Sequence, residues 1–397
     1  MLSVDDAIAT LLEGARVLAG EEQADLAHAL GRTLAAPLVA RIDVPPADNS
    51  AMDGFAIRHA DCGSETASLP ISQRVTAGSS PAELETGTAA RIFTGAEVPP
   101  GADTVVMQEN CEASESALRI LRLPAPGANI RRRGQDIARG ATVLEAGTRL
   151  RPQDVGLAAS LGLASLPLRR RLRVAILSTG DELVEPGEPA RPGKIYNSNR
   201  YTMRSQLEAW GFEPVDLGVA RDEHAAVREA LREAASAADV VMTSGGVSVG
   251  EEDHVRNVVQ ELGEISLWRI AIKPGKPFAF GQVTGKPFLG LPGNPVSVFV
   301  TMLIVARPFL FACQGARETT LTPFRAPAQF DKRGSSREDY LRVRSGDDGS
   351  LKPFANQSSG VLFSTSWADG LVRQRQGQDI HTGDIVDFFP FALFNQG

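Results

Sequence analysis

Polar or glycine-rich loops follow four apolar segments that lie between residues 174 and 291. They cover residues 178–182, 221–223, 244–253 and 291–295. If the preceding segments are parallel strands, the loops lie along one edge of a sheet, where loop amides and helix N-termini converge on ligands. A single loop of this composition is more often an ordinary crossover turn. The joint placement of four such loops instead indicates a binding site.

Two of these loops could bind a phosphate. Gly245, Gly246 and Gly250 would let main-chain amides approach an anion that a Cβ atom would exclude. Pro295 suits the first turn of a helix, so a helix beginning there would point its positive end toward the same edge. Neither loop matches the dinucleotide-binding or P-loop consensus, which disfavours a Rossmann dehydrogenase and a P-loop NTPase. The predicted ligand-binding residues of these loops are Ser244, Gly245, Gly246, Ser248, Pro292 and Pro295.

Three acidic residues, Glu182, Asp222 and Asp253, would stand at the same edge. Beside a bound phosphate they would repel the ligand unless a cation lay between them. A hard divalent ion such as Mg²⁺ accepts carboxylate and phosphate oxygens together, so we predict that these three residues bind Mg²⁺. The alternative is that the acids only stabilise helix N-termini, and for Asp222 the two interpretations are equally supported.

A short basic loop adds two ammonium groups. In the segment 273–277, Lys273 and Lys276 are spaced by prolines and a glycine. Such a stiff pair could hold a phosphate or another oxyanion. Solvated surface lysines are the plainer interpretation, and they would not need this rigid spacing.

The first half of the chain carries a second set of candidates. Asp53 lies in a polar stretch before an apolar segment, Thr94 follows another apolar segment, and Arg131 and Asp136 belong to one basic cluster. A carboxylate, a hydroxyl and a guanidinium could together reach an anion. A plain loop around Asp53 and a solvated surface for the arginine run are the alternatives.

The strands and helices that position the four polar loops should come from an alternating strand and helix pattern in the surrounding sequence. Such alternation specifies parallel strands with helical crossovers, here an open sheet covered on both faces. The longest apolar run, 296–306, has about half of the roughly 20 residues that cross a bilayer and is closed by Arg307 and Pro308, so we expect a buried helix. The pattern predicts strands at 174–177, 215–219, 240–242, 278–280 and 288–291, and helices at 199–210, 223–235, 253–262 and 295–311.

The flanking sequence has a different texture. Ser3 can cap an amphipathic helix whose apolar face runs from residue 4 to residue 18. Between residues 43 and 140, prolines and glycines break short apolar stretches, which predicts β structure with many turns. Helical spacing resumes at 151–166, so the pieces on either side could form one group interrupted by this insertion. Beyond residue 322 a small β domain is expected, with strands at 340–343, 360–364 and 384–389.

Composition limits the classes of protein that are possible. The chain has 397 residues, 43% of them hydrophobic and 22% charged, which is ordinary globular composition and more than one core organises. The net charge of −7 opposes a nucleic-acid role. The acidic start lacks the features of a secretory signal, and no membrane role is expected. Three scattered cysteines suit a reducing cytoplasm and are expected to be buried thiols, without a structural zinc site.

These patterns predict a multidomain α/β chain. Its centre is an open, mostly parallel α/β sheet domain, accompanied by a β-rich inserted domain and a small C-terminal β domain. The expected domains are an N-terminal helical linking domain (1–43 with 141–170), the β-rich insertion (44–140), the α/β domain (171–320) and a C-terminal β-barrel-like domain (321–397).

Seven motifs, in order along the chain, resemble those of the MoeA family of molybdopterin molybdenumtransferases, to which the E domain of gephyrin is related. The resemblance spans nearly the whole chain, and seven ordered matches make coincidence improbable. The motifs lie at residues 48–56, 91–106, 131–137, 178–183, 243–254, 272–281 and 291–297.

The resemblance implies an elongated, four-domain subunit that forms a homodimer, with a cleft between the α/β domain of one subunit and the β-rich domain of its partner. It implies Mg²⁺ and two substrates, molybdate and adenylyl-molybdopterin. The implied reaction splits the phosphoanhydride, releases AMP and leaves molybdenum on the dithiolene sulfurs, the last common step of molybdenum cofactor biosynthesis. Since those sulfurs come from the substrate, no cysteine cluster is needed. Contacts with the molybdopterin adenylyltransferase and with molybdoenzyme maturation factors are also implied.

The same resemblance carries roles onto individual residues. Lys273, Lys276, Pro292 and Pro295 match substrate-side loops, and Arg131 matches a basic cleft position. A polar loop of the C-terminal domain, with Ser358, is the candidate for that domain's contribution. We expect Asp53 and Asp253 to be the most damaging to lose, and Thr94 and Lys273 to help hold molybdate. The positions that match acidic or hydroxyl residues of the cleft are Asp53, Thr94, Asp136, Glu182, Asp222 and Asp253.

Two other functions stay open at this point. A molybdopterin adenylyltransferase resembles the segment 172–310 but is typically that domain alone, so the β-rich insertion and the C-terminal domain argue against it. A non-catalytic dimeric scaffold for cofactor assembly would need no intact site, whereas every candidate cleft residue is present in this chain.

Overall fold

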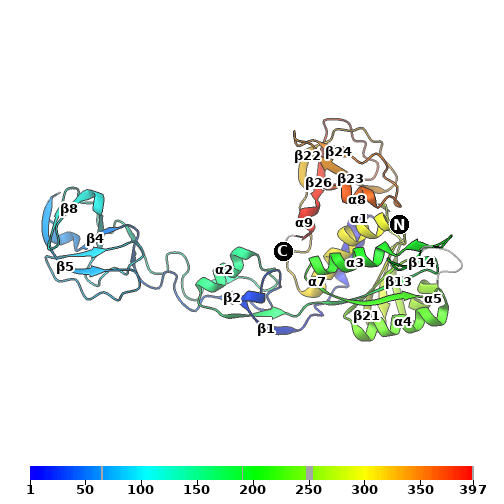
Figure 1. Cartoon of the computed structure of the whole chain (residues 1–397), viewed down its shortest axis with the longest axis horizontal. Coiled ribbons are helices and arrows are strands. Elements are labelled where there is room, and N and C mark those ends of the chain that lie inside the picture. Colours follow the sequence, from blue (N-terminus) through cyan, green and yellow to red (C-terminus); the bar gives the residue numbers. More distant parts are fainter. Residues whose placement is uncertain (64–65, 190, 247–253, 396–397) are drawn as a thin grey trace. The chain divides into compact units, whose positions relative to one another are not determined.

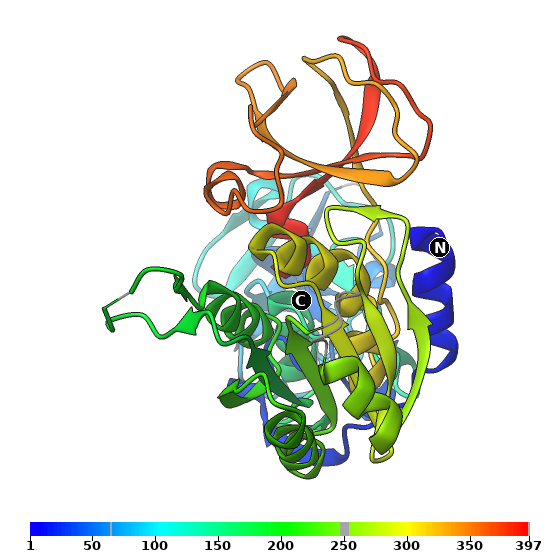
Figure 2. The same cartoon turned by 90° about the vertical axis from the view of Figure 1, so that its right-hand side faces the viewer.

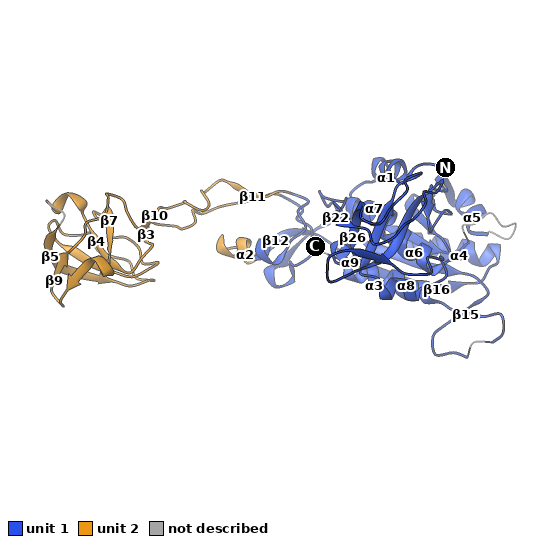
Figure 3. Cartoon of the chain, turned by 90° about the horizontal axis from the view of Figure 1, so that it is seen from above, with its two compact units in different colours: residues 1–36, 146–155, 165–397 blue, residues 37–145, 156–164 orange. Residues whose placement is uncertain are grey.

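The computed structural model of the chain describes residues 1–63, 66–189, 191–246 and 254–395. It divides into two compact units, which Figure 3 colours separately. Unit 1 consists of residues 1–36, 146–155 and 165–397, and unit 2 of residues 37–145 and 156–164. The four predicted domain borders stay a prediction, because these units divide the chain at other positions.

A six-stranded mixed sheet forms the centre of unit 1 (Figures 1 and 2). Its parallel part confirms the expected open α/β sheet. The parallel strands are, in sheet order, β16 (Glu213–Ala220), β13 (Arg173–Thr179), β17 (Val240–Ser244) and β21 (Lys286–Leu291), followed by the antiparallel β20 (Ala279–Val283) and β18 (Gly263–Trp268).

The antiparallel edge corrects the expectation that the alternation continues unchanged through residues 278–291. Only Thr284 and Gly285 join β20 to β21, with φ values of 47° and 78°. A connection of two residues with positive φ makes a tight hairpin, whereas parallel neighbours need a crossover of about a dozen residues or more. The strand pair therefore turns back on itself.

Helices cover both faces of this sheet, as the sequence predicts. Val174 and Ile176 of β13 belong to the same core cluster as Met203 and Leu207 of α3 (Ser198–Ala209). Their alternate neighbours, such as Leu177, pack with α4 (His224–Ala237) and α5 (His254–Leu262). Alternation along a strand sends successive side chains to opposite faces, so two cores are built from one strand.

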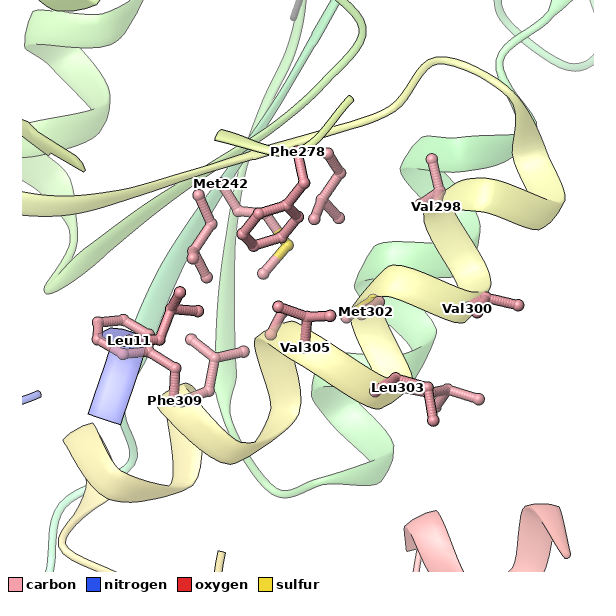
Figure 4. Close-up of a cluster of buried hydrophobic side chains, with 14 of the residues drawn as sticks. Leu11, Met242, Phe278, Val298, Val300, Met302, Leu303, Val305 and Phe309 are labelled. Carbon is pink, nitrogen blue, oxygen red and sulfur yellow. The ribbon is translucent and has the colours of Figure 1, made fainter. Parts of the chain in front are cut away.

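The long apolar helix is longer than the sequence indicates. It runs as α6 (Pro295–Thr301), the π-helical turn η4 (Met302–Ala306) and α7 (Arg307–Gln314), so it continues past Arg307 and Pro308, as predicted, and ends three residues beyond 311. Pro308 cannot donate an amide proton and would clash in a regular α-helical turn, and the wider π turn before it is a known way to absorb such a break. Figure 4 shows Val305 and Phe309 beside Met242, Phe278 and Leu11.

By length and composition this 20-residue segment, Pro295–Gln314, could cross a membrane, yet 89% of its most apolar window is buried inside the structure. Arg307, which lies within it, is also buried. Its guanidinium donates to the carbonyls of Phe394 and Thr319 and lies 4.6 Å from the ring centroid of Phe311. Burial lowers the pKa of Arg307 to about 10. The segment is the core helix of unit 1.

The two ends of the linking region pair with each other. β1 (Glu21–Asp25) is antiparallel to β12 (Ser165–Arg169). α1 (Val4–Glu13) begins after Ser3, whose hydroxyl accepts the Asp6 amide, but it stops before residue 18. α2 (Pro152–Ser160) also ends before residue 166, because Gly162 has a φ of 75° and β12 follows.

The six-stranded sheet of unit 2 confirms the expected β-rich insertion. Two short ladders accompany it, one joining β3 (Asn49–Ser50) to β10 (Ile130–Arg131) and the other β2 (Leu38–Val39) to β11 (Thr142–Leu144). In sheet order the six strands are β7 (Thr104–Met107), β4 (Gly54–Ile57), β6 (Ala89–Ile92), β5 (Ala67–Val75), β9 (Ala117–Ile120) and β8 (Cys111–Ala113).

The C-terminal sheet also confirms the expected small β domain, and β19 (Ile272–Lys273) from the α/β region joins its edge. The strand expected at residues 360–364 is wrong, because α8 (Phe363–Trp367) occupies this region. Phe354 contacts both Phe363 and Trp367, and helical spacing brings these two rings to one side. The other elements are β22 (Phe324–Pro327), β23 (Glu338–Ser345), β24 (Leu351–Pro353), β25 (Gly370–Gln374), β26 (Ile385–Pro390) and α9 (Phe391–Asn395).

An ion pair at the start of β17 provides a test of the fold. Arg170 donates to both carboxylate oxygens of Asp239, at 2.7 and 2.8 Å, and the Arg173 amide donates at 2.9 Å. Asp239→Asn should lower the free energy of unfolding at pH 7 by about 2 kcal/mol, because it removes the charge of a largely buried carboxylate that accepts hydrogen bonds from Arg170 and from the Arg173 amide. Urea unfolding measures this loss. Glu213→Gln, which removes an exposed pair with Arg173, should cost less than about 1 kcal/mol.

The same pair predicts a pH dependence. Burial by itself raises the pKa of Asp239, but the hydrogen bonds from Arg170 and the Arg173 amide outweigh it and hold the pKa below the ordinary 3.8. The stabilisation is therefore complete above that value and disappears as pH falls through the lower, folded-state pKa. The difference between wild type and Asp239→Asn should shrink in that range. A difference that stays constant from pH 7 to pH 2 would contradict this account.

Candidate functional site

Four strand ends lie together at one edge of the unit 1 sheet. Ser178 of β13 is opposite Ser244 of β17, and Ser244 is opposite Leu291 of β21. Thr179 of β13 is likewise opposite Ala220 of β16. The four polar loops identified in the sequence therefore leave the sheet at the same edge.

Asn199 ties two of these loops together. From the first turn of α3, its amide nitrogen donates to the Ser244 hydroxyl at 2.8 Å and to the Gly293 carbonyl at 2.7 Å. The Gly245 amide donates to the Leu291 carbonyl at 3.2 Å. The sequence interpretation missed Asn199. Its signal was an Asn-Ser-Asn segment where the helix begins, which is also typical of ordinary capping.

Two side-chain amides at this edge each have one buried atom without a hydrogen-bond partner. Within the described residues, neither Asn197 Nδ2 nor Asn199 Oδ1 has a hydrogen-bond partner. Asn197 is 1% exposed, and its Oδ1 already accepts the Arg200 amide at 3.2 Å. An unpaired buried polar group costs about 1–3 kcal/mol, so such groups are typical of places where water or a ligand completes the network.

The glycines after β17 are required by the path of the chain. Gly245 and Gly246 have φ values of 89° and 65°. A Cβ atom on Gly245 would lie 2.8 Å from the Thr179 carbonyl oxygen, and one on Gly246 would lie 2.3 Å from Val255 Cγ2. Close packing between β13 and α5 thus explains these glycines, and anion binding by their amides stays a prediction. Ser248, Gly250 and Asp253 lie outside the described residues.

The loops that carry Glu182 and Asp222 are hydrogen-bonded to each other. The Asp222 amide donates to Asp181 Oδ1 at 3.2 Å. Glu182 is exposed, Asp222 is partly exposed, and the Glu182 carbonyl accepts the Ile195 amide beside the short pair β14 (Leu183–Val184) and β15 (Ile195–Tyr196). Carboxylate oxygens from two joined loops suit a hard cation. Among the described residues no three His, Cys, Asp or Glu side chains are grouped as for a metal, and Asp253 is not among them.

The N-terminus of α6 is partly occupied by the C-terminal domain. Pro295 lies in the first turn, as predicted, and the Val296 amide donates to the Ser359 carbonyl at 3.0 Å. Less of this helix end is therefore available to an anion than the sequence indicates. The contact also brings the loop of Ser358 next to the start of α6. Ser358 is exposed, and its carbonyl accepts from Arg342 at 3.2 Å.

The two lysines of the basic loop differ in their surroundings. Lys273 Nζ is 3.2 Å from Asp339 Oδ2, an oxygen that Lys332 also approaches at 3.4 Å. Lys276 is exposed and forms no ion pair with any described residue. A Cβ atom on Gly275 would lie 2.4 Å from Thr301 Cγ2, so the loop packs directly on α6. Lys276 is thus the better-placed ammonium for an oxyanion.

In unit 2 the structure brings Asp53 and Thr94 together. Asp53 precedes β4, and its Oδ1 accepts both the amide and the hydroxyl of Thr94 at 2.7 Å each. These two bonds, with a smaller effect from the charge of Arg91, hold the pKa of Asp53 below its ordinary value. The carboxylate is exposed and ionised, and its Oδ2 atom makes no hydrogen bond within the described part of the chain.

Arg131 lies near this pair. It is opposite Asn49 in the β10–β3 ladder, and the carbonyl of the next residue, Ser50, accepts the Gly95 amide at 2.8 Å. Arg131 is exposed and has no ion-pair partner among residues that the structure describes.

The rest of the arginine run is not simply solvated. Arg132 is 2.6 Å from Asp48, and Arg133 is 2.6 Å from Asp43. Asp136 is exposed, and its amide donates to the Val44 carbonyl at 3.0 Å. Ion pairs at two of the three arginines leave Arg131 as the one available to a ligand in this run.

The three cysteines are not suited to act as nucleophiles or metal ligands, because burial raises the pKa of each thiol. All three are free thiols; Cys62 and Cys313 are buried as expected, whereas Cys111 is only partly buried. Burial raises the pKa of Cys313 to about 12 and that of Cys111 to about 11. Neutral thiols are poor nucleophiles and poor metal ligands.

The candidates thus form two groups, a sheet-edge group in unit 1 and an Asp53–Thr94 group in unit 2. Comparisons with known proteins cover both. Three family descriptions match the chain: "MoeA N-terminal region (domain I and II)" over residues 2–162, "Probable molybdopterin binding domain" over 175–312, and "MoeA C-terminal region (domain IV)" over 325–391.

Similar proteins carry consistent names. A molybdopterin molybdenumtransferase of Haemophilus influenzae is 42% identical over 346 residues, covering 86% of this chain and 85% of the relative. One of Nostoc is 40% identical, covering 73% and 68%. A crystal structure of a molybdopterin biosynthesis MoeA protein from Pyrococcus horikoshii has a TM-score of 0.84 at 31% identity, covering 98% of this chain and 99% of the other.

Proposed function

The chain belongs to the MoeA family, and from that membership and its site geometry we propose that it is a molybdopterin molybdenumtransferase. It takes molybdate and adenylyl-molybdopterin, splits the phosphoanhydride, releases AMP and leaves molybdenum on the dithiolene sulfurs. We also propose that it works as a cytoplasmic homodimer, in which the sheet-edge group of one subunit faces the Asp53–Thr94 group of its partner.

The observation that carries this proposal is the joined pair of loops after β17 and β21. Asn199 holds them together through its amide nitrogen, while the buried atoms Asn197 Nδ2 and Asn199 Oδ1 have no partner among the described residues. Lys276 stands on a loop that packs against α6, the helix that follows the second of these loops. A pre-formed polar edge with a cation beside it suits a substrate that combines a polar pterin with anionic groups.

The residues of the chain have separable roles in this proposal. Lys276 neutralises an oxyanion, and the loop held by Asn199 orients the pterin substrate. Asp53 is fixed through Oδ1 by Thr94, which leaves Oδ2 to accept a proton or a hydrogen bond from a reactant. Positioning and charge neutralisation account for most of the catalysis expected of such a site.

We further propose that Glu182, Asp222 and Asp253 bind Mg²⁺ through their carboxylate oxygens. Glu182 and Asp222 lie on two loops that are hydrogen-bonded to each other. When bound there, Mg²⁺ would neutralise charge on the diphosphate. We propose Asp253 as a ligand from the sequence alone.

The direct test is AMP release by the purified protein incubated with adenylyl-molybdopterin, molybdate and Mg²⁺. Molybdate-dependent release is expected, without consumption of ATP. A scaffold protein would release no AMP, and an adenylyltransferase would instead consume ATP with unmodified molybdopterin. Either result would overturn the proposal.

Removing the free ammonium should weaken molybdate binding. Lys276→Ala should raise KM for molybdate at least tenfold, about 1.4 kcal/mol, because one charge-assisted contact to the oxyanion is lost. Steady-state AMP release at varied molybdate measures this. Lys352→Ala, an exposed lysine of β24, serves as the matched control and should leave KM unchanged. If both substitutions shift KM equally, only general surface charge is involved.

The acid on the neighbouring loop should govern the magnesium requirement. Glu182→Gln keeps the size of the side chain and removes its charge, so half-maximal AMP release should need at least tenfold more Mg²⁺. Glu188→Gln, an exposed glutamate of the same region, should need no more than wild type. An unchanged Mg²⁺ titration for Glu182→Gln would remove this residue from the metal site.

A further inference from the structure

A pocket in unit 2 holds none of the residues that the proposed reaction uses, although the charge of one lining residue, Arg91, also acts on Asp53. Its volume is about 530 Å³, within the usual range for small-molecule sites. Phe55, Ile71 and Cys111 line its apolar part, and two arginines, Arg74 and Arg91, line its polar part. The pocket therefore combines apolar surface with positive charge.

The two arginines stand side by side on neighbouring strands. Arg74 of β5 and Arg91 of β6 are register partners in a parallel pair. Both guanidiniums lie over the ring of Phe93, with centroid distances of 4.9 and 4.8 Å, and Arg91 also lies 5.0 Å from the centroid of Phe55. Like charges at directly paired positions repel each other, whereas the aromatic faces hold them in place.

No acidic partner balances this charge in the described part of unit 2. Arg91 donates to the Gly54 carbonyl at 3.1 Å and to Gln108 Oε1 at 2.8 Å, and Arg74 is exposed. Glu115 lines the pocket but forms no ion pair with either arginine among the residues described. The charge of Arg91 helps to lower the pKa of Asp53, but the two form no ion pair. Asp53 Oδ1 instead accepts a hydrogen bond from the Thr94 hydroxyl.

We infer that this pocket binds an organic phosphate, whose oxyanion lies between Arg74 and Arg91 and whose apolar body lies against Phe55 and Ile71. Guanidinium groups match phosphate oxygens in bidentate geometry, and a doubly charged oxyanion would relieve the repulsion between the two arginines. The apolar lining selects a phosphate ester over inorganic phosphate. The inference rests on residues of unit 2 alone, and its ligand is not a reactant of the proposed transfer, although Arg91 also acts on Asp53.

The test uses the full-length wild-type protein and the arginine reagent phenylglyoxal, with phenyl phosphate as the probe. Peptide mass spectrometry gives the modification rate at each arginine. Phenyl phosphate should slow modification of Arg74 at least fivefold, and inorganic phosphate at the same concentration should slow it less. Arg122, exposed in the same unit and without a side-chain partner among described residues, should be modified at the same rate throughout.

Two results would overturn the inference. If Arg74 is protected no more than Arg122, the pocket binds no phosphate ester. If inorganic phosphate protects Arg74 as well as phenyl phosphate does, the apolar lining takes no part and the assigned ligand class is wrong. AMP release is measured separately, so protection of Arg74 and failure of the proposed transferase activity are distinguishable.

The variant Arg74→Gln removes one of the two arginines and tests whether they bind the phosphate as a pair. Arg74→Gln should retain its fold, since Arg74 is exposed and its side chain forms no ion pair with a described residue, and circular dichroism checks this. In this variant phenyl phosphate should no longer protect Arg91. In the matched Arg122→Gln variant, protection of Arg91 should equal that of wild type. Undiminished protection of Arg91 in a folded Arg74→Gln protein would show that the two arginines do not act as a pair.

Discussion

Asp53→Asn should lower kcat for AMP release by about 1,000-fold, while the free energy of unfolding changes by less than about 1 kcal/mol. The amide can still accept both bonds from Thr94, so the substitution removes charge and basicity and keeps the geometry. Stopped assays of AMP release with urea unfolding measure both quantities. Glu112→Gln, an exposed acid of the same unit, should leave both unchanged.

Because Asp53 must be ionised to act, kcat should depend on pH. Hydrogen bonds from the amide and hydroxyl of Thr94 hold the pKa of Asp53 below 3.8, so the active, ionised form persists as pH falls through the ordinary range. Thr94→Val removes the hydroxyl bond and keeps the amide bond. The acidic limb of kcat should then move to higher pH. An acidic limb that stays in place in Thr94→Val would separate Asp53 from the chemical step.

Gly54→Ala should cost about 3 kcal/mol or more in the free energy of unfolding. A Cβ atom at this position would lie 1.9 Å from the Val106 carbonyl oxygen and 3.1 Å from Met107 Cα. These are main-chain atoms of β7, which pairs with β4 at Gly54 and cannot move without breaking the ladder. Gly54 thus sets the position of Asp53, and thermal or urea unfolding measures the cost.

Gly63→Ala is the matched control for Gly54→Ala. A Cβ atom on Gly63 meets no described atom within 4 Å, so this substitution in the same unit should change stability by less than about 1 kcal/mol. Equal stability of the two alanine variants would show that the close approach of β4 to β7 is not rigid.

Local patterning was sufficient to predict the α/β core. β17 is a short, fully buried and mostly apolar run and α4 has its apolar residues on one helical face, and the structure confirms both predicted elements. The sheet-edge loops followed from the topology of parallel strands. Helix α8 was missed because its signal is a contact of Phe363 and Trp367 with Phe354, which depends on the fold.

The candidate site was predictable by residue type but not by pairing. In the sequence Lys273 and Lys276 are equivalent candidates, yet Lys273 forms an ion pair with Asp339 of the C-terminal domain. Arg131 resembles its two neighbours in sequence, yet Asp48 and Asp43 pair with those neighbours and not with Arg131. Long-range ion pairs of this kind carry no local sequence signal. Asn199 was missed for the same reason, because its partners Ser244 and Gly293 come from other loops.

Mixing two inactive variants tests the central claim most directly. The proposal places Asp53 of one subunit opposite Glu182 of its partner, so a dimer of Asp53→Asn with Glu182→Gln chains contains one intact site. Co-expressed and purified as mixed dimers, the two variants should recover about half of the wild-type AMP release, while each variant alone, assayed at wild-type Mg²⁺, stays low. A mixed dimer as inactive as its parents would contradict a site shared between subunits.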